Sequence, residues 1–211
     1  MGTGSFEVEL VSEFFDFNSN SEIAMPFGFG IGLAENTDFL LGLSYHKYWD
    51  EENNFTSFND IIIELKQMLF TDEVRFGVKP FISIPTGDHS RGFGAGKLNY
   101  GMIILLTKEW EKFHIHTQLG YTHNKNSVNQ NENLWEYSVA LEKLFSDRFS
   151  GLLEFGVSSN CCPYNSEPPK FISLGAAYLL EENFSISAGL IRGIHNVDQY
   201  LGLTGGITVT F

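Results

Sequence analysis

The segment Ile23-Ala-Met-Pro-Phe-Gly-Phe-Gly-Ile-Gly-Leu33 decides the fold class, because large apolar residues fill every odd position and small residues or proline fill every even one. A period of two over this length predicts a β-strand, and the 3.6-residue period of a helix fits it poorly. The same alternation recurs in the segments that begin at Phe39, Val74 and Phe113. The sequence therefore predicts an all-β protein.

About twelve such segments fit in the 211 residues, each near the roughly 9–11 residues that a tilted strand needs to cross a bilayer. They are expected to begin near Ser5, Glu22, Asp38, Asp60, Val74, Leu98, Lys112, Leu134, Arg148, Phe171, Asn183 and Gln199. Short connections at 35–37, 71–73, 109–111, 146–147 and 181–182 alternate with long ones at 49–59, 86–97, 123–133 and 159–170 and modest ones at 18–21 and 194–198. An even number of strands with this alternation of turns and loops is typical of outer-membrane barrels.

A soluble barrel is the alternative interpretation of the alternation. Its apolar parity would point inward, and twelve strands would then enclose an apolar cavity that needs a plug, since eight strands already give an interior that side chains just fill. The other parity is rich in Gly, Ser and Thr, whereas a soluble exterior carries about 25–35% charged residues. Placing the apolar parity against lipid removes both difficulties, and closure satisfies every backbone polar group. We predict a closed antiparallel transmembrane β-barrel, formed by residues 1–211 as a single domain, in the outer membrane of a Gram-negative cell. Its short turns and both termini are expected in the periplasm, and its longer loops outside the cell.

Composition excludes several classes of protein. Lys and Arg number 13 against 26 Asp and Glu, a formal charge of -13, so no basic face is available for a nucleic acid. No stretch approaches the roughly 18 consecutive apolar residues of a membrane-spanning helix. The first residues show no basic stretch followed by an apolar segment, so no signal peptide is seen, although Met1-Gly-Thr-Gly is equally what a start codon placed on a mature sequence gives.

The last segment carries a second indication of an outer-membrane protein. Its apolar parity is Leu201, Leu203, Ile207, Val209 and the terminal Phe211. A terminal Phe on an alternating strand resembles the insertion signal that the outer-membrane assembly machinery reads, although a strand can also simply end in Phe. The expected partners are therefore membrane lipids, lipopolysaccharide, the assembly machinery and a small-molecule solute.

The parity predicted to face the lumen carries charges of both signs. These candidate lumen-lining and selectivity residues are Glu7, Glu9, Glu64, Lys66, Arg75, Lys79, His114, His116, Glu136, Glu142 and Glu154. Aligning neighbouring strands places Glu64 opposite Lys79 and His114 opposite Glu142. Such pairs can simply brace the wall. They can also line a wet lumen whose acidic excess favours cations or neutral solutes.

Two groups of residues suggest chemistry, and neither is assigned any. His114 and His116 lie two apart on one face, but two imidazoles lack the third ligand of a catalytic zinc, so no metal site is predicted. Asp88-His89-Ser90 contains the residue types of a hydrolase, but three adjacent loop residues do not by themselves make a nucleophile–base–orienter arrangement. We therefore expect no catalytic residues and no enzyme activity.

Two further motifs add little. The segment Gly92-Phe-Gly-Ala-Gly-Lys97 has the wrong spacing for a phosphate loop, Leu98 stands where Ser or Thr is needed, and no helix is expected after it, so no cofactor is predicted. Cys161 and Cys162 are adjacent in a long loop, where a strained disulfide and two free thiols are both possible.

One segment resembles a known family. Lys79-Pro-Phe-Ile-Ser-Ile-Pro-Thr-Gly-Asp88 leads into a glycine-rich loop and Leu98-Asn-Tyr-Gly-Met102. This resembles the outer-membrane transporters of the "MetA-pathway of phenol degradation" family, which carry a Pro-Thr-Gly-Asp strand end and a glycine-rich approach to the next strand. Leu119-Gly-Tyr-Thr122 and Glu182-Asn-Phe184 are similar to that family too.

The resemblance implies a barrel of about twelve strands that is linked to uptake of aromatic or other apolar compounds and has no established catalytic residues. The chain is somewhat short for the family, so trimmed loops are expected. The predicted function is passive passage of small solutes through a lumen constricted by the inward charged side chains and the 86–97 loop. A non-conducting structural barrel and a barrel that hydrolyses lipids are the alternatives.

Overall fold

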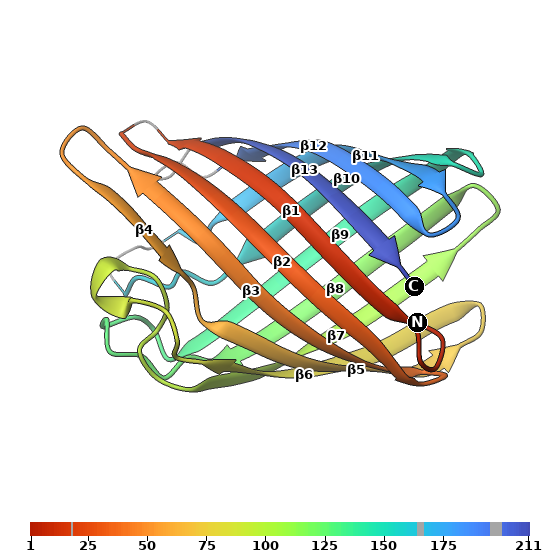
Figure 1. Ribbon diagram of the computed structural model, residues 1–211, viewed down its shortest axis with the longest axis horizontal. Helices are drawn as coiled ribbons and strands as arrows, with labels where there is room; N and C mark the ends of the chain where they lie inside the picture. The colour runs from red at the N-terminus through yellow and green to blue at the C-terminus, as the bar shows by residue number, and fades with distance from the viewer. Residues whose placement is uncertain (18, 164–166, 195–199) are drawn as a thin grey trace.

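The computed structural model describes residues 1–17, 19–163, 167–194 and 200–211. Within these residues thirteen β-strands form one antiparallel sheet, which closes on itself as a barrel of tilted strands (Figure 1). In the part of the chain so described, no helix is both long and apolar enough to cross a membrane.

Twelve of the described strands build the closed wall. They are β1 (Phe6–Phe17), β2 (Ser21–Ala34), β3 (Thr37–Trp49), β5 (Ile61–Thr71), β6 (Val74–Ile84), β7 (Asn99–Glu109), β8 (Phe113–His123), β9 (Asn133–Ser146), β10 (Phe149–Ser158), β11 (Lys170–Glu181), β12 (Phe184–Gly193) and β13 (Tyr200–Thr210). Each pairs with its neighbours along the wall, and β1 closes the barrel on β13 with Glu7 opposite Thr210 and Phe17 opposite Tyr200. Closure pairs the strand edges, which a wall inside lipid requires.

The predicted strands are confirmed to within one residue at every start that falls in the described part of the chain. Gln199, the predicted start of the last strand, lies outside the described residues, as do Asn18 and residues 195–198 of the two modest connections. One strand was not predicted. β4 (Asn54–Phe58) pairs with the C-terminal half of β3, and the hairpin that these two strands form projects at the end of the barrel that carries the longer loops (Figure 1). Its five residues are too few to cross a bilayer, so it falls within the predicted 49–59 loop.

The connections separate by length as predicted. Both termini lie with the short turns at one end of the barrel, which we call the turn end, and the longer loops lie at the other, the loop end (Figure 1). The connection between β6 and β7 folds around the short 3-10 helix η1 (His89–Arg91) at the loop end.

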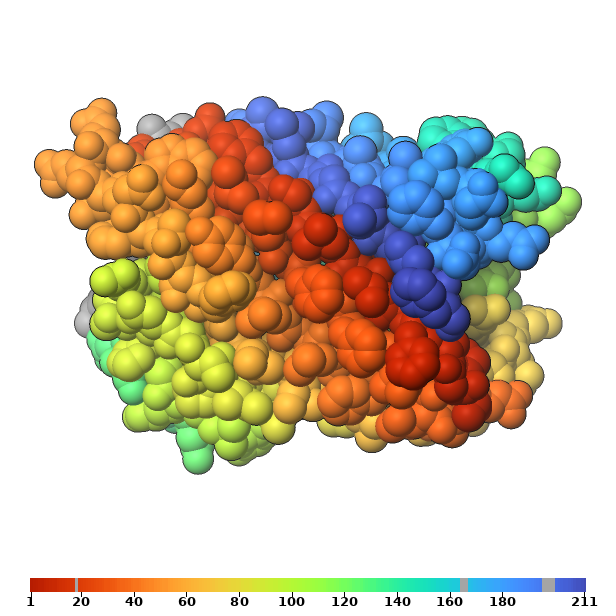
Figure 2. Space-filling model, viewed as in Figure 1, coloured from red at the N-terminus to blue at the C-terminus, as the bar shows by residue number. Residues whose placement is uncertain are grey.

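The outer surface of the wall is apolar. Large side chains of the apolar parity stay exposed, for example Leu174 at 60% and Leu203 at 51%, and no large side chain among the described residues is fully buried. Side chains cover the face over β1–β3 and β13 as one continuous surface (Figure 2). A soluble barrel would bury these residues, so the exposure supports the predicted lipid-facing orientation.

Aromatic side chains gather toward the ends of the wall. Seven of them fall near strand ends, where the aromatic girdles of a membrane barrel are expected: Tyr45, Trp49, Tyr100, Trp110, Tyr121, Trp135 and Tyr178. Tyr100, Tyr121 and Trp135 are exposed near the loop ends of β7, β8 and β9, and Tyr121 lies directly opposite Trp135. This placement suits side chains that are apolar on their faces and polar at their tips, since a membrane interface offers both environments.

Candidate functional site

Among the described residues, side chains of the inward parity border at least three cavities of the lumen. The turn-end cavity has a volume of about 560 Å³, the side cavity along β10–β13 about 340 Å³ and the loop-end cavity about 360 Å³. Polar residues around the turn-end cavity include Asp38, Lys66, Arg75, Thr107, Glu109, His116, Gln118 and Glu154. Those around the side cavity include Glu13, Glu142, Ser150, Glu154, Ser173, Ser187 and Thr204. Those around the loop-end cavity include Glu9, Ser44, Asn59, Asp60 and Ser83.

An ion pair lies between the turn-end and loop-end cavities. Glu64 Oε1 is 3.0 Å from Lys79 Nζ, and the two side chains are only 18% and 21% exposed. On β5, Ile62 borders the loop-end cavity and Lys66 the turn-end cavity, so Glu64 lies between the two. A charged pair from two neighbouring strands therefore lines the lumen between these two cavities, and both of its side chains are largely shielded from water.

The predicted Glu64–Lys79 pair is formed, but its register was predicted wrongly. Phe81 lies directly opposite Glu64, and Lys79 reaches the carboxylate diagonally. A direct Glu64–Lys79 pairing needs a turn centred between Thr71 and Asp72, whereas Thr71 lies opposite Arg75, so the turn is centred on Glu73. A bulge between Met68 and Phe70 then shifts the register back by one residue, toward the predicted pairing.

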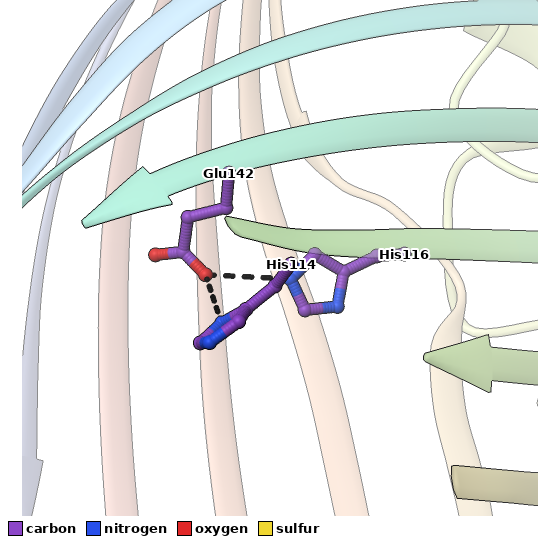
Figure 3. A group of neighbouring side chains, drawn as sticks. All are labelled: His114, His116 and Glu142. Carbon is purple, nitrogen blue, oxygen red and sulfur yellow. Dashed lines mark hydrogen bonds and ion pairs between the residues drawn. The ribbon is translucent and has the colours of Figure 1, made fainter. Parts of the chain in front are cut away.

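The second predicted pair has the expected register and an additional member. His114 lies directly opposite Glu142, and its Nδ1 is 3.2 Å from Glu142 Oε2. His116 Nε2 approaches the same oxygen at 3.3 Å (Figure 3). Both imidazoles come from β8 and the carboxylate from β9, and all three side chains are partly buried.

The remaining predicted lumen residues lie at several levels of the barrel. Arg75 pairs with Glu109 at 3.0 Å beside the turn-end cavity, and Lys66 lies opposite Asp38 there. Glu154 accepts a long 3.5 Å hydrogen bond from Ser173. Glu9 borders the loop-end cavity, Glu7 lies opposite Thr210, and Glu136 folds over Gly120, where an added Cβ would come within 2.6 Å of its Cγ.

The connection between β6 and β7 is anchored to the barrel at the loop end. The Asp60 carboxylate accepts hydrogen bonds from the backbone N–H groups of Gly87 and Ala95, both at 2.9 Å. Phe93 is only 6% exposed, and its ring centroid lies 6.2 Å from that of His46, which is on the inward parity of β3. The 86–97 loop is therefore folded onto the mouth of the lumen.

Backbone conformation and close packing explain why this loop contains several glycines. Gly94 has a φ of 101°, and a Cβ there would come within 2.2 Å of the Asp60 carboxylate. Gly92 and Gly96 also have positive φ, at 89° and 71°. The Gly-Phe-Gly-Ala-Gly run thus allows the tight approach to Asp60.

The Asp88-His89-Ser90 segment forms a local turn. The Ser90 hydroxyl donates to Asp88 Oδ1 at 2.6 Å, and this hydrogen bond is the main reason that the pKa of the Asp88 carboxyl lies below its ordinary value. The imidazole of His89 lies against Gly96. The serine hydroxyl is therefore held by a carboxylate, and within the described residues it has no hydrogen bond to an imidazole.

Several inward polar residues were missed. They are Glu13, Glu22, Asp38, His46 and Asp60. Glu13 shares the parity of Glu7 and Glu9, so continuing the alternation along β1 would have found it. Glu22 Oε1 lies 2.5 Å from His46 Nδ1, and Asn59 Nδ2 lies 3.3 Å from the other ring nitrogen of His46.

The two adjacent cysteines are free thiols, with their sulfur atoms 3.5 Å apart. Burial raises the pKa of the Cys161 thiol above its ordinary value, and Cys162 is the more exposed of the two. Of the alternatives left open by the sequence, the structure has the thiols.

The solved structures to which the chain is similar include outer-membrane channels and porins. An outer-membrane channel from Pseudomonas putida F1 superposes with a TM-score of 0.84 at 10% sequence identity, covering 100% of this chain and 97% of that one. The NanC porin superposes with a TM-score of 0.67 at 8% identity over 96% and 98% of the two chains. The CymD monoaromatic hydrocarbon channel gives 0.58 at 8% identity over 100% and 88%. No curated protein matches the sequence.

At identities this low, the superpositions establish the fold alone. Together with the apolar outer face and the polar side chains of the lumen, the fold defines the class: the chain is a transmembrane β-barrel of the kind that forms outer-membrane channels. The family model described as "Putative MetA-pathway of phenol degradation" matches residues 2–211, so the chain belongs to that family. The resemblance noted in the 79–102 segment is thereby confirmed over almost the whole chain.

Proposed function

We propose that this protein is a channel through which small solutes cross the outer membrane passively. The observation that carries the proposal is the succession of cavities, each with charged or polar side chains in its lining, inside a wall whose outer face is apolar. A barrel that only braced the membrane would have no need for this internal space. Membrane lipids and lipopolysaccharide surround the outer face, and the solute occupies the lumen.

The charge of the lumen favours cations and neutral solutes. The predicted lumen-lining residues contain more carboxylates than basic side chains, and Glu13 in the side cavity adds another. Carboxylates facing a narrow aqueous space attract cations and repel anions. We assign selectivity to this set of residues as a whole.

Small aromatic compounds are the solute class that we propose. The family description refers to phenol degradation, and the similar CymD protein is named a monoaromatic hydrocarbon channel. The turn-end cavity combines apolar side chains, among them Met68, Leu105 and Leu152, with polar ones such as Thr107 and Gln118. A phenol, which has an apolar ring and one hydroxyl, matches such a lining.

This solute class is tested by blocking the ion current through the inserted protein. Phenol, added to one side of a planar bilayer, is expected to reduce the current in a concentration-dependent way, and cyclohexanol serves as the matched non-aromatic control. A reduction by phenol well beyond that by cyclohexanol supports an aromatic solute. Equal effects of the two, or none, contradict it.

We propose no catalytic activity. The similar solved structures include channels and porins, and the Ser90 hydroxyl donates its hydrogen bond to Asp88. Hydrolysis assays on phospholipid and lipid A esters are expected to give no turnover. Turnover that Ser90→Ala abolishes would establish the lipid-hydrolase alternative instead.

The assembly machinery is the remaining proposed partner. Phe211 is 72% exposed beyond the end of β13, and its backbone N–H donates to the carbonyl of Phe6 at 2.7 Å across the closing seam. We expect Phe211→Ala to reduce the amount of folded barrel in the outer membrane several-fold. Urea-denatured Phe211→Ala protein refolded into detergent should fold as the wild type does, which separates recognition from stability.

A further inference from the structure

The cluster of His114, His116 and Glu142 has the donor atoms of a metal site. Glu142 Oε2 lies 3.2 Å from His114 Nδ1 and 3.3 Å from His116 Nε2, and the three donor atoms are within 4.8 Å of one another. The two rings are nearly perpendicular, at 88°, and both turn an edge toward the carboxylate (Figure 3).

These separations match the edges of a coordination polyhedron. An ion with bonds of about 2.0–2.1 Å holds tetrahedral ligands about 3.3–3.4 Å apart. The two carboxylate–imidazole distances already have this length. A modest rotation of either imidazole brings His114 Nδ1 and His116 Nε2 to the same separation. Two imidazoles and one carboxylate also make the donor set that zinc prefers when one position is left open for a small ligand.

Neighbouring side chains orient two of the three donors. His116 Nδ1 is 3.1 Å from Thr107 Oγ1 on β7, so the ring can keep its proton on Nδ1 and present the lone pair of Nε2. The Ser150 side chain on β10 lies beside the Glu142 carboxylate and lines the side cavity with it. Four adjacent strands thus contribute to one cluster, and supporting contacts of this kind are usual around metal ligands.

The other histidine–carboxylate pair of the lumen is different. Glu22 meets one imidazole, that of His46, whose second nitrogen faces the Asn59 amide. That arrangement is a complete hydrogen-bonded brace. In the cluster, one carboxylate oxygen instead faces two imidazole nitrogens, and His116 also borders the turn-end cavity, from which an ion and its remaining ligand can enter.

We propose that His114, His116 and Glu142 bind a divalent transition-metal ion, with Zn²⁺ as the probe of choice. Thr107 is a positioning residue for His116. The proposal concerns binding and does not depend on solute passage, so failure of one leaves the other intact.

The test is calorimetric titration of ZnCl₂ into the refolded full chain in detergent. All samples carry Cys161→Ser and Cys162→Ser, so that the thiols do not bind zinc. We expect one zinc per chain, at least tenfold weaker binding in His116→Gln and Glu142→Gln, and a smaller loss in Thr107→Val. His46→Gln is the matched control and should bind as the parent does.

Three results would overturn the proposal: no zinc binding by the parent, unchanged affinity in both ligand variants, or an equal loss in His46→Gln. Heat-modifiable gel mobility checks that each variant is folded. A second measurement needs no ligand variant: Co²⁺ bound to two imidazoles and a carboxylate shows visible absorption bands that are shifted and intensified relative to the ion in buffer. Bands unchanged from those in buffer also contradict the site.

Discussion

Lys79 is a lumen-lining residue whose positive charge is expected to affect both stability and ion selectivity. It pairs with Glu64 between the turn-end and loop-end cavities, where both side chains are largely shielded from water. Replacing Lys79 by Met leaves a partly buried carboxylate without its partner. We expect a loss of about 1–3 kcal/mol in the free energy of unfolding, because an unpaired buried charge is unfavourable. Water in the lumen keeps this loss below that of a fully buried charge. Reversal potentials should show stronger cation selectivity.

Lys108→Met is the control for this experiment. Lys108 pairs at 3.0 Å with Glu73, an exposed residue in the turn between β5 and β6, so the same charge is removed away from the lumen. Selectivity should stay at the wild-type value in this variant. If Lys79→Met loses stability but its selectivity also stays unchanged, the pair only braces the wall, as in the non-conducting alternative.

The two cysteines give a second prediction at this scale. Because burial raises the pKa of the Cys161 thiol, this residue has less of the reactive thiolate at neutral pH, and Cys162 is more exposed. Maleimide labelling followed by peptide mapping should therefore modify Cys162 first, with Cys161 reacting faster as the pH rises. Failure of both to react until a reductant is added would show a disulfide instead.

Among the larger elements, the loop between β6 and β7 depends on one carboxylate. Asp60 accepts the backbone N–H groups of Gly87 and Ala95, and each hydrogen bond to a charged group contributes roughly 1.5–3 kcal/mol. Asp60→Ala should release the loop from the mouth of the lumen. We expect trypsin cleavage after Arg91 or Lys97 to become at least about tenfold faster, and the conductance to increase.

Asp72→Ala is the matched control for the loop. It removes the same charge from an exposed turn at the opposite end of the barrel. Its cleavage rate and conductance should equal those of the wild type. Wild-type rates in Asp60→Ala would mean that the loop is held by other contacts, such as the packing of Phe93 against His46.

The wall strands could be predicted from the sequence because alternation is a local property. In β2, for example, Phe27, Phe29 and Ile31 lie on the apolar parity while glycine fills the positions between them, and no partner strand is needed to see this. The β4 strand could not be predicted, because its five residues give too short a pattern and depend on pairing with the end of β3. Strand parity thus predicts the wall of the barrel, but it does not predict the structure of the segments at the loop end.

The site was predictable only in part, for the same reason. Parity identified the inward charges, and simple alignment placed His114 opposite Glu142. The approach of His116 to that same carboxylate depends on rotamers, and the Asp60 anchor depends on how a distant loop folds back. Neither follows from residue spacing. The predicted register of Glu64 and Lys79 was wrong because the centre of the turn is set by backbone geometry, which residue spacing does not give.

At the level of the whole molecule, the barrel combines an apolar outer face with an acidic interior. The formal charge of -13 is carried partly by carboxylates on the inward parity, where they act on any ion that enters. The ion pair at Glu64 and the loop over the mouth leave separate cavities in place of one wide pore. The whole molecule should therefore pass small solutes and conduct in small, cation-leaning steps.

Single-channel recording of the refolded protein in a planar bilayer, with reversal potentials under a salt gradient, tests the proposed channel most directly. Steady small current steps with a reversal potential of cationic sign are the predicted result. Absence of current from protein whose insertion is shown by heat-modifiable mobility and protease protection would contradict the channel and favour a structural barrel.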